Sequence, residues 1–264
     1  MQIAGAASLR QCLDIQRRVL HALMMREVIT RFGRENLGVL WLIGEPVIFT
    51  LGVATLWSLA NLRHSSMIPI VAFAVTGYSS VLMWRNASNH AGAAVAQNKS
   101  LLFHRSVRVI DVLITRAALE IGGASASFIL LSSLFIFIGW MPMPADPLKV
   151  LFGWGMLAWF GMALAIFIGA GSSFSEVVVR LWHPITYLLF PLSGAAFMVD
   201  WLPERLQGIV MVLPMVHGVE ILREGFFGGI VPAHYDVGYM AVCCLVLSLA
   251  GLSLASEASR RVQF

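Results

Sequence analysis

Apolar residues in this chain occur in blocks long enough to cross a lipid bilayer. Residues 121–140 contain no charged side chain, and neither do residues 150–174. A transmembrane helix needs about 20 predominantly apolar residues. With 58% hydrophobic and only 12% charged residues, the chain also has too little charge to cover a soluble domain of 264 residues. The sequence therefore predicts an integral membrane protein.

We predict an all-α, polytopic membrane protein with six transmembrane helices and an N-terminal amphipathic interface helix. Residues 1–36 would form the cytoplasmic interface helix, because leucines and arginines alternate there at helical spacing. A soluble helix packed on a partner is the alternative for that segment. Residues 37–264 would form one transmembrane domain. Its spans are placed at about residues 37–62, 68–89, 119–140, 150–174, 181–199 and 237–256.

A small-residue stripe recurs every four residues in the fourth span. Gly161, Ala165, Gly169 and Ser173 share one helix face. Small residues let two helices approach closely within a membrane. We expect this stripe to be a packing surface.

The segment 203–230 is apolar enough to enter lipid, yet Pro214, Glu220, Arg223 and Glu224 interrupt it. If it crossed the membrane, the two chain ends would lie on opposite sides. Two short helices hinged at Pro214 would instead enter and return, which membranes tolerate where protein or a wet cavity covers the backbone. We therefore expect an outward-facing re-entrant helical hairpin between spans five and six. Its three charged residues would face a wet vestibule.

Basic residues set the orientation. Fourteen of the 18 Lys and Arg residues fall on one side of the predicted topology, in the N-terminal segment, in residues 85–116, at Arg180 and in the tail. The positive-inside rule puts that side, with both termini, in the cytoplasm. The net charge of +4 thus describes topology and does not indicate nucleic-acid binding.

The sequence lacks the motifs of several common enzyme classes. Neither lysine, Lys99 or Lys149, belongs to a GxxxxGK phosphate loop, and no HExxH or GxSxG motif occurs. His217 and Glu220 form only a single HxxE, which chance often produces. The three cysteines have no CxxC spacing. We predict no catalytic residue and no metal site.

Two charged residues fall near the same ends of the first two spans. Glu45 and Arg85 could form an ion pair, because charges inside a membrane usually pair or face water. Alternatively, each side chain reaches the interface separately.

The entry to the first span resembles that of type-2 ABC exporter permeases. It reads REVITRFGRENLGVLW from Arg26 to Trp41, followed by Glu45-Pro46. The later Leu213-Pro214, with His217-Gly218 and LREG at residues 222–225, resembles the outer region of the capsular polysaccharide export permease family. The resemblance covers essentially the whole chain.

This resemblance implies a function and a set of partners. The chain would be the permease of an ABC exporter that moves a lipid-linked capsular polysaccharide across the bacterial inner membrane. It would pair with a second copy and with two ATPase subunits, which bind the ATP and Mg²⁺, and it would bind no cofactor itself. Periplasmic and outer-membrane export components would also take part.

The resemblance also places the coupling segment at about residues 97–110. There we predict a short helix that inserts into a cleft of the ATPase, because clustered apolar side chains flanked by basic ones make effective interface anchors. The alternative is a helix that only returns the chain to the membrane. The predicted contact residues are Lys99, Leu101, Leu102, Phe103 and Arg105.

Aromatic side chains suit the passage of a glycan, since they cover the apolar face of a sugar without fixing one hydrogen-bond pattern. The mid-span candidates for a substrate channel are Phe49, Phe73, Tyr78 and Tyr187. Each could instead be an ordinary packing or interface residue.

Two other classes of function stay open. The same architecture could export O-antigen, teichoic acid, a lipid or a drug. The chain could also be an intramembrane enzyme or an assembly scaffold. Stable co-purification with an ATPase would distinguish a transporter from an intramembrane enzyme and from a scaffold.

Overall fold

In the computed structural model, every element in the described part of the chain is a helix. The structure describes residues 9–32, 47–52, 55, 68–102, 107–230 and 232–262, and residues 47–52 are helical. The all-α prediction is confirmed for these residues. The elements are α1 (Leu9–Phe32), α3 (Ile70–Gln97), α4 (Lys99–Leu102), α5 (Val109–Ile138), α6 (Pro147–Ser172), α7 (Glu176–Leu192), η1 (Val199–Trp201), α8 (Glu204–Val210), α9 (Pro214–Phe227), η2 (Gly228–Ile230) and α10 (Val237–Val262).

Helix α3 forms the centre of the bundle. It packs against α5, α6, α7 and α9, and most of its side chains are buried. The predicted stripe on α6 faces it. A Cβ added at Gly161 would lie 3.3 Å from the Cα of Trp84, and one added at Gly169 would lie 2.9 Å from the carbonyl oxygen of Ala91. The backbones of α3 and α6 can therefore pack closely, because the glycines at the contact have no side chain.

Within the part of the chain that the structure describes, three helices are long and apolar enough to cross a membrane, namely α5, α6 and α10. They correspond to the predicted spans at 119–140, 150–174 and 237–256, although α5 begins earlier, at Val109. The start of α6 is fixed by Asp146, whose carboxylate accepts the backbone N–H groups of Leu148 and Lys149 at 3.0 Å each.

The other predicted spans correspond to less regular segments. The span predicted at 68–89 overlaps α3, which carries the polar residues Arg85 and His90. The span predicted at 181–199 overlaps α7, which has 17 residues and two internal prolines. Neither α3 nor α7 is among the helices that are both long enough and apolar enough to cross a membrane. The first span, at 37–62, lies mostly outside the described residues. Six spans therefore stay a prediction.

Helices α8 and α9 meet at a bend of 109°. Helix α8 ends at Val210 and α9 begins at Pro214, whose missing N–H is not needed in a first helical turn. The break that the sequence predicts at Pro214 is therefore present. Together the two helices are apolar enough for a fourth span, and their path relative to a bilayer stays a prediction.

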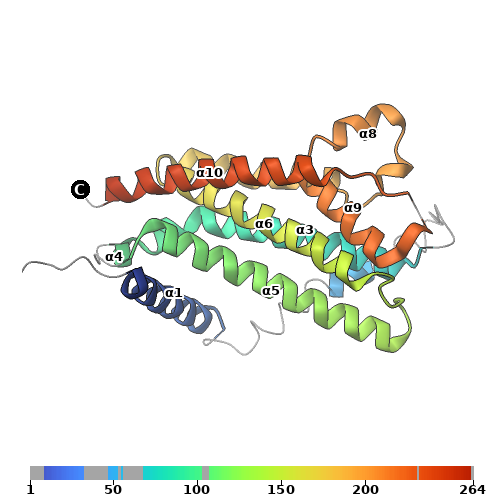
Figure 1. Ribbon diagram of the computed structural model, residues 1–264, viewed down its shortest axis with the longest axis horizontal. Coiled ribbons are helices and arrows are strands. Elements are labelled where there is room, and N and C mark those ends of the chain that lie inside the picture. The colour runs from blue at the N-terminus through green and yellow to red at the C-terminus, as the bar shows by residue number, and fades with distance from the viewer. Residues whose placement is uncertain are drawn as a thin grey trace, which may run out of the picture.

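Figure 1 shows two groups of elements at opposite ends of the bundle. Helices α1 and α4 and the C-terminal end of α10 lie toward one end, whereas α8 and α9 lie toward the other. Helix α1 packs against α5. The basic residues of α1, α4 and the C-terminal end of α10 thus lie toward the same end of the molecule.

Candidate functional sites at the two ends of the bundle

Three polar residues of α9 lie on one buried face. His217, Glu220 and Arg223 are three residues apart, a spacing that places them on the same side of a helix. Their exposed fractions are 2%, 0% and 0%. Because α9 packs against α3, α6 and α10, these groups are surrounded by protein and need partners there.

Arg223 binds the connection that follows α7. Its Nη1 donates to the carbonyl oxygens of Gly194 and Phe197 at 2.5 and 2.6 Å, and its Nη2 donates to that of Ala195 at 2.7 Å. The guanidinium carbon also lies 3.8 Å from the ring centroid of Phe73. The planar fork of N–H donors on arginine matches such a set of carbonyls. One side chain therefore holds residues 194–197 against α9.

Glu220 binds two further segments. Its Oε1 accepts the backbone N–H of Val199, and its Oε2 accepts that of His234, both at 3.2 Å. The guanidinium of Arg223, on the same face, fits beside α3 because position 77 is a glycine. A Cβ at Gly77 would lie 2.6 Å from Nη2 of Arg223. The carboxylate and the guanidinium also balance each other's charge within the buried face.

His217 and Tyr239 bind the bend between α8 and α9. Nε2 of His217 donates to the carbonyl of Met211 at 2.8 Å, while its Nδ1 accepts the N–H of Asp236 at 2.9 Å. The hydroxyl of Tyr239, on α10, donates to the carbonyl of Val212 at 2.8 Å. The carbonyls left free where α8 ends are thus satisfied by side chains of two other helices.

The structure corrects the predicted wet vestibule. Glu220 and Arg223 do not face water, because they are fully buried and bound to backbone groups. Glu224 behaves differently: its carboxylate pairs with Nζ of Lys149 at 2.7 Å, and its side chain is 28% exposed. Pro214 begins α9, as predicted for a hinge.

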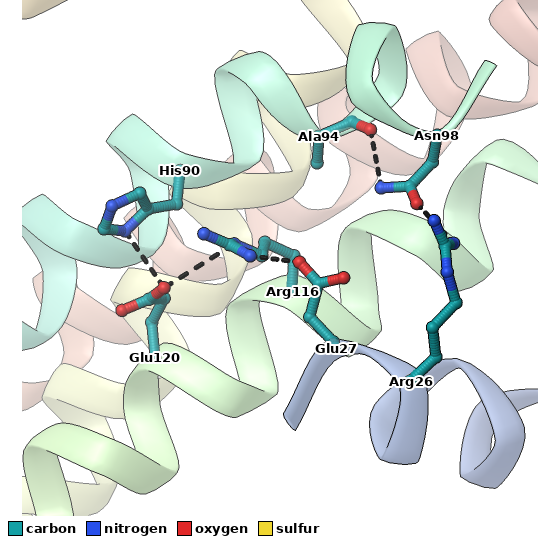
Figure 2. A network of polar contacts seen from close by, with 7 residues as sticks. All are labelled: Arg26, Glu27, His90, Ala94, Asn98, Arg116 and Glu120. Atoms are coloured by element: carbon teal, nitrogen blue, oxygen red, sulfur yellow. Dashed lines mark hydrogen bonds and ion pairs between the residues drawn. The ribbon is translucent and has the colours of Figure 1, made fainter. Parts of the chain in front are cut away.

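At the opposite end, α1 is tied to the bundle by polar side chains (Figure 2). Arg26 of α1 donates to Oδ1 of Asn98 at 2.8 Å, and Nδ2 of Asn98 donates to the carbonyl of Ala94 at 2.9 Å. Asn98 is the C-cap of α3 and directly precedes α4. A second link joins Gln16 of α1 to the carboxylate of Asp111 on α5. Helix α1 therefore contacts both the end of α3 and the start of α5.

The same network continues into the bundle through Arg116 of α5. Arg116 forms an ion pair with Glu27 of α1, and its Nε lies 3.5 Å from Oε1 of Glu120. Glu120 also lies 3.0 Å from Nδ1 of His90 on α3. Figure 2 shows these four side chains in a row from α1 across α5 to α3.

The predicted coupling segment is helical at its start, where α4 covers Lys99 to Leu102. Lys99 is exposed, and its contact with an ATPase stays a prediction. Leu102 is only 5% exposed and packs in a cluster with Leu113, so the prediction that it anchors an ATPase is wrong. Phe103 and Arg105 lie outside the described residues, and so does the side chain of Leu101.

The four predicted channel aromatics do not form one surface. Phe49 stacks on Tyr78 with 3.6 Å between ring centroids, and both contact Phe190 of α7. Tyr78 and Phe73 are 6% and 2% exposed, which contradicts a channel-lining role for these two in this chain. Tyr187 is 71% exposed on α7. Thus only Tyr187 and the half-buried Phe49 keep a free edge.

The predicted pair between Glu45 and Arg85 is untested, since Glu45 lies outside the described residues. Within those residues, no three His, Cys, Asp or Glu side chains gather as a metal site would require.

Sequence reasoning missed the link through Arg116. A signal was present, because Arg116 and Glu120 are charged residues at helical spacing next to an uncharged run. Charges in a membrane helix face protein or water, so their presence indicates a polar partner on a neighbouring helix. The identity of that partner, Glu27, is separated by 89 residues and carries no local pattern.

Comparison with known proteins gives a consistent result over almost the whole chain. Residues 18–227 match the family profile described as ABC-2 type transporter. The chain is 41% identical to the capsule polysaccharide export inner-membrane protein CtrC of Neisseria meningitidis serogroup B, and 40% identical to BexB of Haemophilus influenzae, which has the same description. Each alignment covers 100% of this chain and 99% of the relative. The polysialic acid transport protein KpsM of Escherichia coli is 27% identical over 93% of this chain and 95% of its own length.

Proposed function

Because the chain belongs to the ABC-2 type transporter family, we propose that it is the inner-membrane permease of an ABC exporter of capsular polysaccharide. The observation that carries the proposal is the similarity of about 40% identity along the full length to CtrC and BexB, whose names state this function. The three membrane-length apolar helices agree with it. Energy would come from two separate ATPase subunits that bind ATP and Mg²⁺.

The proposed topology has six spans, with both termini in the cytoplasm. Helix α3 can serve as a span despite Arg85 and His90, because α5, α6, α7 and α9 pack around it and its polar groups need not meet lipid. Helix α7 would be the fifth span and residues 37–62 the first. The bent pair α8–α9 would form the re-entrant hairpin at the outer end.

The proposed assembly is a pair of permease copies with an ATPase below each. Helix α7 supports it, since its partners are α3 and α6 on one side while large apolar residues, including Tyr187, are exposed on the other. We propose that a second copy and the lipid-linked glycan meet this face, with Tyr187 and Phe49 against the sugar. The exposed Lys99 on α4 would contact the ATPase, and periplasmic and outer-membrane components would receive the product.

Deletion of the gene in its host tests the proposed function. Polysaccharide should disappear from the cell surface and accumulate inside the cell, and a plasmid-borne copy should restore export. The tagged protein should also co-purify with an ATPase. Unchanged surface polysaccharide in the deletion strain would contradict the proposal, and surface loss of another glycan or a lipid would redirect it.

A further inference from the structure

Arg116 is shared between two carboxylates that belong to different elements. One is Glu27 on α1, and the other is Glu120 on the same helix as Arg116. Glu120 is 4% exposed and keeps a second contact with His90. If α1 moved away, Arg116 would still have Glu120 as its partner. Separation would therefore leave Arg116 with a partner, and it would avoid the cost of leaving that largely buried arginine unpaired.

The remaining contacts of α1 are few among the described residues. Leu23 packs against the core cluster that contains Leu113, whereas Leu13 and Ile29 are 67% and 66% exposed. Helix α1 is thus held mainly by the polar contacts of Figure 2 and by the Gln16–Asp111 hydrogen bond. A helix held in this way can detach without opening the core of the bundle.

The same network reaches the coupling segment. Arg26 is next to Glu27 and donates to Asn98, the residue immediately before α4. A displacement of α4 would change the position of Asn98 and would pull on α1. These contacts therefore connect α4, the element that an ATPase would move, with α1, the helix that can detach from the bundle.

We propose that Glu27 and Arg116 are positioning residues that couple ATP hydrolysis to export. They hold α1 against α5 in the resting transporter, and α1 separates from α5 in each transport cycle while Arg116 stays paired with Glu120. This inference rests on the function proposed above, since it requires an ATPase that moves the coupling segment.

The first test replaces the α1 partner alone, in the full permease–ATPase complex. Glu27→Gln removes the ion pair but leaves Arg116 with Glu120, so the complex should assemble and hydrolyse ATP. Export per ATP hydrolysed should fall about fivefold, the lower range of coupling between distant sites. Glu257→Gln is the matched control, because it removes the exposed contacts of Glu257 with Arg260 and Arg261 near the end of α10. An unchanged ratio of export to hydrolysis in Glu27→Gln would overturn the proposal.

The second test prevents separation. Gln16→Cys with Asp111→Cys, in a protein whose three native cysteines are serine, places two thiols where α1 and α5 touch. The oxidised protein should hydrolyse ATP without exporting, and reduction should restore export. Equal export by the oxidised and reduced forms would show that α1 need not move. Because the reduced form must export, this failure is distinct from failure of the proposed function, in which neither form exports polysaccharide.

Discussion

The two polar regions of this molecule use opposite kinds of contact. On α9, His217, Glu220 and Arg223 bind backbone groups of the segments around them and are almost fully buried. At α1, Glu27 and Arg116 bind each other through side chains that are 17% and 15% exposed. A contact with a backbone group can break only if the chain itself moves. The Arg116 side chain, which lies between two carboxylates, can lose one of them and keep the other. The contacts of α9 therefore fix one end of the bundle, whereas those of α1 suit the separation proposed above.

This difference corresponds to what each end would do in an exporter. The α9 face joins the connection after α7, the α8–α9 bend and the segment before α10 into one unit. Such a unit moves as a rigid body or not at all. The α1 contacts, by contrast, lie next to α4, where a movement driven by an ATPase would enter.

The largest expected effect comes from removing the arginine at the fixed end. Arg223→Met leaves three carbonyl acceptors and Glu220 without their cation, at a cost of about 3 to 5 kcal/mol. The purified protein should unfold at a much lower temperature or fail to accumulate. Arg205→Met on α8 is the control, since Arg205 is exposed. If both variants unfold at the temperature of the parent protein, the α9 contacts do not stabilise the end of the bundle that carries α8 and α9.

A smaller effect is expected from the neighbouring carboxylate. Glu220→Gln keeps the shape but replaces one acceptor by a donor that faces a backbone N–H, and it removes a charge-assisted hydrogen bond, at a cost of about 2 kcal/mol. Thermal unfolding in detergent measures it. Glu224→Gln, on the same helix, should cost less because Glu224 is partly exposed. The opposite order would mean that the Lys149 pair, and not the buried face, stabilises α9.

Much of the fold follows from the sequence, because long apolar runs fix α5, α6 and α10. The bend at Pro214 also follows, since proline cannot continue a helix from its preceding turn. The burial of Glu220 and Arg223 does not follow. Their local pattern is that of exposed charges, and their partners are carbonyl and N–H groups that every residue carries. Nothing in the sequence distinguishes the carbonyls of Gly194 and Ala195 from any others.

The coupling segment shows the same limitation in another form. Leu102 is an apolar residue in a basic loop, a pattern that suits a partner protein and the chain's own core equally well. The structure decides for the core, because Leu102 is buried in the same cluster of side chains as Leu113 of α5. Composition predicts that such a residue is buried, but only the packing shows which surface buries it.

The movable end should respond weakly in stability. Glu27→Gln removes one ion pair that water still reaches, and such pairs contribute about 1 kcal/mol or less. Its unfolding temperature should therefore stay close to that of the parent protein, in contrast to Arg223→Met. A large loss of stability in Glu27→Gln would show that α1 is part of the rigid core, and the proposed difference between the ends would be wrong.

The smallest expected effect is the response to salt, which separates the two ends without any mutation. Screening acts over about 10 Å at 0.1 M salt and about 3 Å at 1 M, and it acts most on charges that water reaches. Glu27 and Arg116 meet that condition, whereas Arg223 and its carbonyl partners are enclosed by protein. Raising the salt concentration should therefore speed amide hydrogen exchange in α1 and leave α9 unchanged. Exchange that rises equally in both helices would mean that salt loosens the whole bundle, and a rise in α9 alone would reverse the assignment of the fixed and movable ends.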